Sequence, residues 1–294
     1  MKNNNVPVLF YTALTVSISA SLLLTGCDDD THQKVTSATA SEQNSIITRE
    51  LVAQATDSAA HWLTPTLIVM PKNDDAVVYQ FINTEEGAFD AIMLSKTTFP
   101  EHIAKKFPHL VDFQAYQVDL SASKAKAWLK QQTLVVALDK AHQTKKVSFV
   151  QTGAVIDALY TQGNNDADEV VDLGATIIRD NKSEVTSVSF KLWAPTAQAV
   201  TVQLFDDNLQ AISNGELKMV EDSNTGVWHV LTESTASYAY YKYQLDVYHP
   251  ASQKVETLAV TDPYSLSLSV NSEYSQVVDL NDKVTQPENW ISHK

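Results

Sequence analysis

The stretch FKLWAPTAQAVTVQLFDD (190–207) decides the fold of the C-terminal half of this chain. Apolar residues alternate with other residues on both sides of its Pro-containing turn: Phe190 and Leu192 precede the turn, and Val200, Val202 and Leu204 follow it. A period of two turns one face of a strand toward a core and the other toward water. The stretch therefore predicts two strands of an antiparallel sheet.

The same alternation continues on both sides of this stretch. GVWHVLT and YYKYQLDVYHP repeat it further along the chain. Short strands spaced by about 8–12 residues, with turns between them, are typical of an antiparallel sandwich. We therefore predict an immunoglobulin-like sandwich over residues 171–285.

Residues 57–170 predict a first β-rich domain. HWLTPTLIVM, AVVYQFI, TLVVALD and KKVSFVQT are rich in β-branched and aromatic residues, which favour strands. SASKAKAWLKQQ predicts a helix capped by Ser121 or Ser123, and GAVIDALY predicts a second, shorter one. The fold class that follows is mainly β, with two β-sandwich-type, immunoglobulin-like domains and a few short helices.

The acidic segment NNDADEVVDLGA (164–175) separates these two domains. A calcium loop of the EF-hand type would need a different ligand spacing and a glycine at its sixth position. Charge runs are usually solvated, so a linker is the better interpretation of the segment.

The N-terminus has the layout of a secretory signal over residues 1–26. A membrane-spanning helix is the alternative, since the apolar run is nearly long enough. LTGC, ending at Cys27, resembles the lipobox of bacterial lipoproteins, which implies cleavage before Cys27 and a lipid on its sulfur. Residues 27–56 are polar and predict a flexible tether, with a short helix near residues 47–54 as the alternative for its end. We expect a lipid-anchored membrane protein of the bacterial cell envelope, within reach of the cell surface.

Composition excludes several classes of function. The net charge of −14 argues against a nucleic-acid partner, because phosphate binding needs basic patches. The single cysteine leaves no disulfide framework and no cysteine-based zinc site, and the eight histidines show no HExxH spacing. The sequence therefore predicts no metal site and no cofactor.

FKLWAPTAQAVTVQLFDD, TGVW, YYKYQLDVYHP and VTDPYSLSLSVNSEYSQVVDLND together resemble the carbohydrate-binding module family 48 domain of debranching enzymes. The last string is typical of the bacterial pullulanase-type α-1,6-glucosidases of glycoside hydrolase family 13. AHWLTPTLIVMP and FPHLVDFQAYQV resemble the domain that precedes the sandwich in those enzymes. The resemblance covers nearly all residues after 57 and implies a non-catalytic N-terminal region acting in starch, glycogen or pullulan breakdown.

In that family the connector after the sandwich leads into a catalytic (β/α)8 barrel. Strings resembling the barrel's DVVYNH, GFRFD and EGW are missing here, and residues 286–294 are interpreted as a truncated connector. A (β/α)8 barrel needs about 250 residues. Whether the chain belongs to an active enzyme stays open, but alone it is expected to be inactive, with a barrel as partner in cis or in trans.

Sugars stack on exposed aromatic faces and hydrogen-bond at the rim of their sites. Tyr240, Tyr248 and Trp62 are the glycan-binding candidates, with Lys242 on the same strand face as the two tyrosines. A domain interface is the alternative use of that face. Three roles remain open: part of a split or truncated pullulanase, a standalone α-glucan-binding lipoprotein, or a scaffold that docks another protein near Tyr264, Leu266 and Leu268.

Overall fold

The computed structural model describes residues 49–73, 78–85, 88–182, 184–232 and 239–280, and the isolated positions 282, 285, 289 and 292. Its elements are, in chain order, β1 (Ala55–Thr64), β2 (Leu67–Met70), β3 (Val78–Glu85), β4 (Ala88–Thr97), α2 (Glu101–Lys106), η1 (Pro108–Leu110), β5 (Gln114–Gln117), α3 (Ala122–Trp128), β6 (Gln132–Leu138), β7 (Thr144–Gln151), α4 (Gly153–Tyr160), η2 (Ala167–Glu169), β8 (Gly174–Arg179), β9 (Val185–Trp193), β10 (Ala199–Phe205), β11 (Ala211–Lys218), β12 (Val220–Asp222), β13 (Val227–Leu231), β14 (Tyr240–His249), β15 (Lys254–Val260), η3 (Val270–Ser272) and β16 (Ser275–Gln276). The mainly-β prediction is confirmed.

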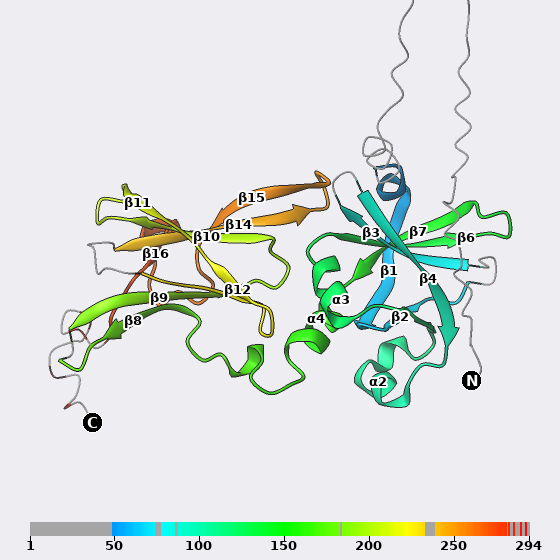
Figure 1. Cartoon of the computed structure of the whole chain (residues 1–294), viewed down its shortest axis with the longest axis horizontal. Helices are drawn as coiled ribbons and strands as arrows, with labels where there is room; N and C mark the ends of the chain where they lie inside the picture. Colours follow the sequence, from blue (N-terminus) through cyan, green and yellow to red (C-terminus); the bar gives the residue numbers. More distant parts are fainter. Residues whose placement is uncertain are drawn as a thin grey trace, which may run out of the picture.

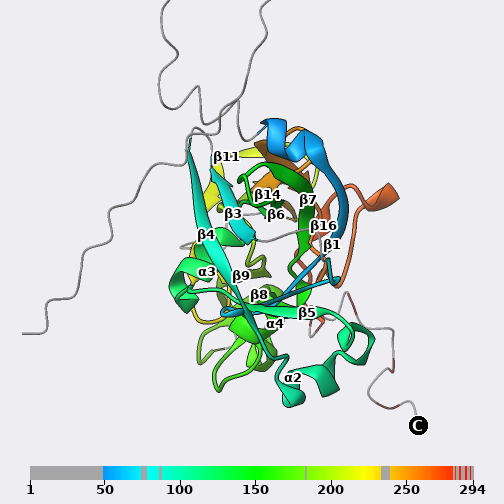
Figure 2. The same ribbon diagram turned by 90° about the vertical axis from the view of Figure 1, so that its right-hand side faces the viewer.

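The first unit is a closed barrel with the strand order β1-β2-β5-β4-β3-β6-β7 (Figures 1 and 2). The sequence predicted a sandwich of two sheets for this unit. The difference arises because β7 returns to β1 and pairs with it in parallel, with Asp57 opposite Ser148. Closure pairs the strands that would otherwise form exposed edges.

The barrel has an inner core and covered outer faces. Inside, the Trp62 ring packs against Phe81 with a centroid distance of 4.9 Å. Outside, residues 49–54 form a helix that buries Val52 against Leu134 and Val136 of β6. Residues 49–56, which the sequence analysis assigned to the flexible tether, therefore belong to the folded unit. Burial of Val52 offsets the entropy of ordering them.

The predicted helices α3 and α4 form as expected, and both contribute to the barrel core. Ser121 caps α3, since its Oγ accepts the Lys124 N–H at 3.2 Å. The α3 residue Trp128 packs on Phe81 with a centroid distance of 4.9 Å. Trp128 and Tyr160 of α4 belong to the same core cluster, so the two helices close one end of the barrel.

The second unit is the predicted sandwich. One sheet has the order β11-β10-β14-β15 with β16 beside β14, and the other has the order β12-β13-β9-β8. Phe190 of β9 and Tyr241 of β14 meet between them with a ring-centroid distance of 5.0 Å. Val202 pairs with Tyr243 across β10 and β14, and both are fully buried. The period-two pattern is thus confirmed on these strands.

The two units touch through α3 and the residues that follow it (Figure 1). Lys130 forms an ion pair with Glu221 of β12 at 2.5 Å. Its Nζ also lies over the ring of Trp228, 5.2 Å from the centroid. Lys126 donates from its Nζ to the Ser223 carbonyl. These contacts join α3 to the β12–β13 hairpin.

Two predictions lie outside the described residues. The structure describes no residue before 49, so the signal predicted over residues 1–26 and the predicted lipid on Cys27 stay predictions. Among the residues it does describe, no helix combines the length and hydrophobicity that a membrane span requires. Nor do three or more His, Asp or Glu side chains gather there as a metal-binding group.

Candidate functional site

An aromatic cluster lies on the outer surface of the sheet formed by β10, β14 and β16. We call it the aromatic face and define it by Phe205, Tyr240, Lys242 and Tyr274. The pattern that turns Tyr241 inward turns Tyr240 and Lys242 outward, because neighbouring strand residues point to opposite sides. Antiparallel pairing then sets Phe205 of β10 opposite Tyr240 of β14.

The rings of the aromatic face meet edge to face. The Tyr274 centroid lies 4.8 Å from that of Phe205 and 6.5 Å from that of Tyr240. Lys242 places its Nζ over the Tyr274 ring, 4.2 Å from the centroid. All four side chains are half-buried, so each keeps part of its surface in contact with solvent. The part of each ring that stays exposed to solvent can contact a ligand.

A buried carboxylate holds Tyr274 in place. Asp262, in the TDPYS string, accepts the Tyr241 hydroxyl at Oδ2 (2.6 Å) and the Tyr264 N–H at Oδ1 (2.8 Å). Its own N–H donates to Ser275 Oγ at 2.8 Å. Since Ser275 follows Tyr274, Asp262 ties the loop that carries Tyr274 to the strand that carries Tyr240.

Burial sets the protonation of this network. Desolvation raises the pKa of Asp262, and the hydrogen bonds from Tyr241, the Tyr264 N–H and Tyr243 offset only part of that rise. Desolvation also raises the pKa of Tyr241 and of Tyr243, with a further contribution from the charge of Asp262. Both phenols therefore stay protonated and can donate.

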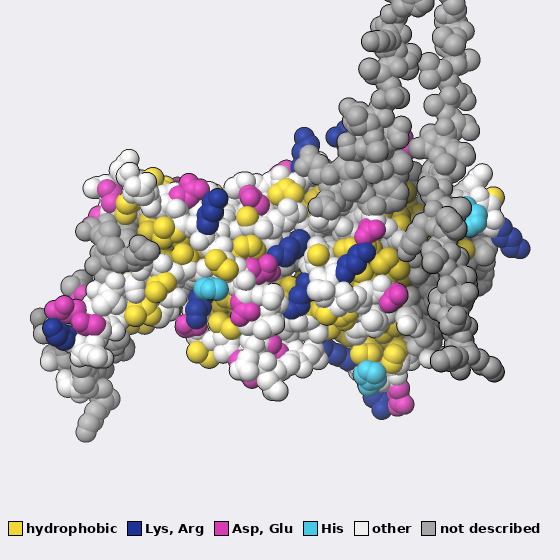
Figure 3. All heavy atoms as spheres, in the orientation of Figure 1, with side chains coloured by type: hydrophobic (Ala, Val, Ile, Leu, Met, Phe, Trp, Pro, Cys, Tyr) yellow, Lys and Arg dark blue, Asp and Glu magenta, His cyan; other side chains and the backbone are white. Residues whose placement is uncertain are grey.

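The aromatic face suits a neutral, hydroxylated ring. A sugar can lay its apolar face on an aromatic side chain while its hydroxyls bind polar groups at the edge. Tyr240 and Tyr274 carry hydroxyls, and Lys242 carries the charged donor. Elsewhere on the surface seen in Figure 3, Lys and Arg side chains are interspersed with Asp and Glu, and hydrophobic side chains lie between them over the sandwich.

The structure separates the three predicted glycan-binding residues. Tyr240 lies on the aromatic face, and its part in binding stays a prediction. Trp62 has 0% of its surface exposed and fills the barrel interior. The prediction for Trp62 is wrong, because a fully buried ring offers no face to a sugar. Its position near the start of the first unit did not indicate that the Trp62 side chain points from β1 into the barrel interior.

Tyr248 lies between the two units. Its ring is half-buried, and its hydroxyl has no exposed surface and lies beside the Thr84 side chain of β3. Burial raises the pKa of Tyr248. This end of β14 therefore belongs to a domain interface, the alternative that the sequence analysis raised for this face. Tyr248 therefore has no exposed hydroxyl with which to bind a glycan.

Sequence reasoning missed two members of the aromatic face, Phe205 and Tyr274. Phe205 ends β10, and the strand period places it outside, so its position was open to prediction. Tyr274 follows the left-handed residues Asn271 (φ 60°) and Ser272 (φ 58°), which turn the chain back toward β14. No periodicity marks such a turn.

Two family models match the chain. The model described as the pullulanase N2 domain matches residues 57–158. The model described as carbohydrate-binding module 48 (isoamylase N-terminal domain) matches residues 172–265. The first range covers the barrel, and the second covers the sandwich up to the TDPYS string.

Curated relatives are similar over most of this chain. A pullulanase of Klebsiella pneumoniae is 34% identical over 241 residues, which cover 79% of this chain and 21% of the relative. The chloroplastic pullulanase 1 of Arabidopsis thaliana is 31% identical over 195 residues, covering 66% of this chain and 18% of the relative. The chain thus spans about a fifth of the length of these relatives.

Solved structures show the same arrangement. The crystal structure of PulA from Klebsiella oxytoca has a TM-score of 0.70 and 31% identity, covering 82% of this chain and 23% of that one. The maltotriose complex of PulA from Klebsiella pneumoniae has a TM-score of 0.69 and 31% identity, covering 81% and 25%. Barrel and sandwich therefore follow one another in these proteins as they do here.

Proposed function

Over residues 57–158 and 172–265 the chain belongs to the pullulanase N2 and carbohydrate-binding module 48 families, and from this we propose that it is the accessory region of an α-1,6-glucan debranching enzyme, which holds α-glucan and carries no catalytic site of its own. The observation that supports glucan binding most directly is the aromatic face. It places two tyrosines, a phenylalanine and a lysine side by side on the sandwich. A relative crystallised with maltotriose supports an α-linked glucan as the ligand.

Affinity electrophoresis tests this proposal. The chain should migrate more slowly in a native gel that contains pullulan or glycogen, and Tyr240→Ala should weaken the retardation about tenfold, because a stacked ring contributes about 1 kcal/mol or more. Phe107→Ala, which truncates a half-buried ring on the barrel, is the matched control and should leave the retardation unchanged. Equal retardation of both variants would contradict the assignment of the site. The chain alone should release no reducing sugar from pullulan.

A second role is supported by an exposed apolar strip, which we define by Leu266, Leu268 and Val270. Their exposed fractions are 67%, 43% and 84%. Below Leu266 a cavity of about 290 Å³ opens between β8 and the TDPYS string. Exposed apolar patches mark contacts with other proteins or domains. We propose that the strip packs against the (β/α)8 barrel that the family resemblance implies.

This second role has its own test. The chain should bind the isolated (β/α)8 domain of a related pullulanase, and the double substitution Leu266→Asp/Val270→Asp should abolish that binding. Tyr240→Ala should leave it intact, because Tyr240 lies outside the strip. Binding that survives the double substitution would exclude the strip as the contact.

We further propose that Cys27 carries a lipid and holds the protein on a membrane of the bacterial cell envelope. The LTGC string supports this proposal. Two or more acyl chains anchor a protein stably, where one chain does not. In cells expressing the chain, radiolabelled palmitate should label it, and Cys27→Ser should remove the label and move the protein to the soluble fraction. Membrane association of an unlabelled Cys27→Ser protein would argue for the alternative, a spanning helix.

A further inference from the structure

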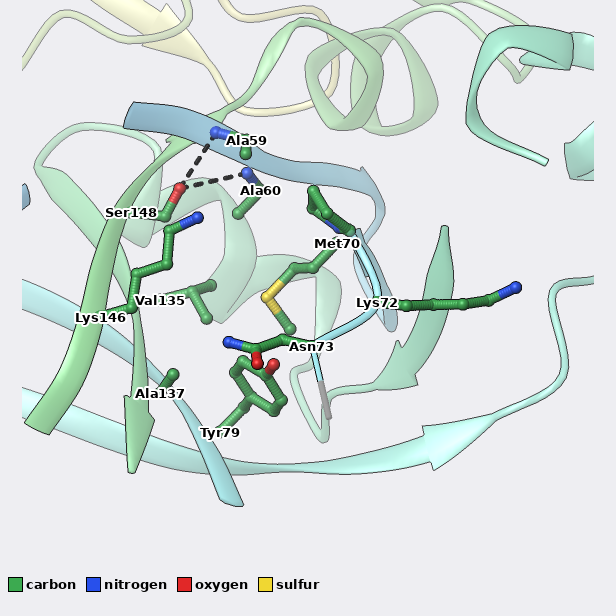
Figure 4. Close-up of a pocket in the computed structure, with 11 residues that line it drawn as sticks. Ala59, Ala60, Met70, Lys72, Asn73, Tyr79, Val135, Ala137, Lys146 and Ser148 are labelled. Carbon is green, nitrogen blue, oxygen red and sulfur yellow. Dashed lines mark hydrogen bonds between the residues drawn. The ribbon is translucent and has the colours of Figure 1, made fainter. Parts of the chain in front are cut away.

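The barrel has a cavity at the end opposite α3. Beta-strand β6 starts next to α3 and ends at the cavity, where β2 also ends and β3 and β7 begin. The cavity measures about 170 Å³, and Figure 4 shows the residues that line it. Small barrels usually fill their interior with side chains or hold one small ligand there. This barrel is filled at the α3 end by Trp128 and Tyr160, and the described residues leave the cavity at the other end.

The cavity exists because its walls carry small side chains. Ala59 and Ala60 of β1 and Ala137 of β6 stand where larger residues would close the barrel. Met70 and Val135 add apolar surface, and Figure 4 shows the Met70 thioether turned toward the centre. The floor is therefore apolar and close in size to a ring of six carbons. An engineered apolar cavity of about 150 Å³ holds benzene.

One side of the mouth carries a polar cluster that is already satisfied. Ser148 Oγ accepts the N–H groups of Ala59 (3.0 Å) and Ala60 (3.3 Å) and donates to Asp57 Oδ1 (2.5 Å). Lys146 pairs with Asp57 Oδ2 at 2.6 Å. Ser148 therefore has its hydrogen-bonding capacity used, and it holds β1 on β7.

The ion pair makes the mouth neutral overall. Burial raises the pKa of Asp57, but hydrogen bonds from Lys146, Ser148 and the Ala59 N–H outweigh it, and the net pKa is lowered. Asp57 is thus ionised and cancels the charge of Lys146. Lys72 also borders the cavity, but Figure 4 shows its side chain pointing away from it. A neutral ligand fits this balance better than an anion, which Asp57 would repel.

Lys146 keeps donors for a ligand. Lys146 has an ammonium group with three N–H bonds, and Asp57 takes one of them. The Tyr79 hydroxyl accepts a hydrogen bond from the Tyr116 hydroxyl, and desolvation raises the pKa of Tyr79, so its phenol stays protonated. Figure 4 shows the Tyr79 ring standing at the cavity wall opposite Lys146.

We propose that the cavity at this end of the barrel binds a neutral, ring-sized apolar molecule with one hydroxyl or carbonyl oxygen, its ring on Ala60, Met70 and Ala137 and its oxygen at Lys146. A pyranose is excluded as the preferred ligand, because its many hydroxyls would be left without partners on an apolar floor. The site is therefore independent of the glucan-binding face.

Calorimetry with benzyl alcohol as the probe tests the proposal on the full chain. Saturable binding with a Kd of about 0.1–1 mM is expected for a ligand of this size. Benzoate and glucose, titrated in the same way, should bind at least tenfold more weakly. No saturable binding of benzyl alcohol up to about 10 mM would overturn the proposal. Glucose or benzoate binding as tightly as benzyl alcohol would overturn the stated ligand class.

Substitutions at the cavity locate the binding site. Ala137→Leu fills the cavity and should abolish binding, with near-ultraviolet circular dichroism to verify the fold. Lys146→Met removes the donor and should weaken binding at least fivefold. This second variant tests the proposal independently if Ala137→Leu does not fold. Lys145→Met is the matched control, because Lys145 is the neighbouring residue on β7, pairs with Asp139 and does not line the cavity. Equal binding by Lys146→Met and Lys145→Met would overturn the assignment of Lys146 as the partner of the ligand's oxygen.

Discussion

Asp262 joins three segments of the sandwich through one carboxyl group and one N–H. It binds Tyr241 of β14, the backbone of Tyr264 and the hydroxyl of Ser275. The strand period predicted that Tyr241 points inward. The strand period did not predict Asp262 as the partner of Tyr241, because a hydrogen bond between side chains 21 positions apart leaves no periodic signal.

The raised pKa of Asp262 predicts how pH affects stability. Because the folded-state pKa lies above the ordinary value of 3.8, folding favours the neutral form. The stabilisation from Asp262 is complete below that value and is lost as the pH rises through the folded pKa. Asparagine at this position does not titrate. The free energy of unfolding of Asp262→Asn should therefore rise relative to wild type between pH 4 and pH 7.

Urea denaturation at several pH values checks this expectation. The difference between the two proteins should change in one direction across the range. A difference that stays constant, or that moves against the variant as the pH rises, would mean that folding does not raise the pKa of Asp262.

Gly226 allows a close approach between the two units. Its φ is +69°, and a Cβ there would lie 2.8 Å from Pro195 Cβ and 3.0 Å from Tyr160 Cε1. Gly226→Ala should lower the free energy of unfolding by about 2 kcal/mol, from the left-handed backbone and the contact together. Chemical denaturation measures the loss.

Gly153→Ala is the matched control for this substitution. Gly153 starts α4, and an added Cβ would have no atom within 4 Å. That change should be neutral or stabilise by up to about 1 kcal/mol, since alanine reduces the entropy of the unfolded chain. Equal losses in the two variants would show that the contact with Tyr160 and Pro195 is not tight.

At the scale of elements, α3 serves two purposes. Its buried face carries Trp128 into the barrel, and the turn after it carries Lys130 to the sandwich. The side chains of Lys130 and Glu221 are 20% and 21% exposed, so their pair is partly shielded from water. Lys130 also covers the ring of Trp228.

Lys130→Met should therefore cost about 1–2 kcal/mol, because it leaves the half-buried Glu221 without its partner. Lys124→Met is the control on the same helix. Lys124 pairs with Asp90, but both side chains are well exposed, and such pairs contribute about 0–0.5 kcal/mol. Denaturation of both variants in the same buffer compares them. A loss for Lys124→Met as large as for Lys130→Met would contradict the role given to the domain contact.

The elements themselves were largely predictable, and the way they close was not. The cap at Ser121 and the alternation on β10 and β14 are local signals, and both were interpreted correctly. The parallel pairing of β1 with β7 joins strands from the two ends of the first unit, so no local sequence pattern predicts the closed barrel. Only part of the aromatic face could be predicted from the sequence. Tyr240 and Lys242 share one strand, whereas Tyr274 follows a turn with left-handed residues.

For the whole molecule, the contacts between barrel and sandwich decide whether the two units unfold together. The Lys130 pair and the close packing at Gly226 lie on one side of this contact, and Tyr248 beside Thr84 lies at the β14 end. Each of these contacts buries groups from both units. Unfolding either unit would expose them, so each unit stabilises the other.

Wild type should therefore unfold in a single calorimetric transition, and the double variant Lys130→Met/Gly226→Ala should unfold in two. Part of the summed loss of about 3–4 kcal/mol falls on the contact, since the backbone strain of Gly226→Ala stays within the sandwich, and both cores stay intact, provided that the two effects add. The double variant Lys124→Met/Gly153→Ala changes the same residue types away from the contact and should keep one transition. Two transitions in wild type would show that the units are independent. A single transition in the contact variant would show that the remaining contacts, Lys126 with Ser223 and Tyr248 beside Thr84, suffice to couple the units, and adding Tyr248→Ala would test the second of them.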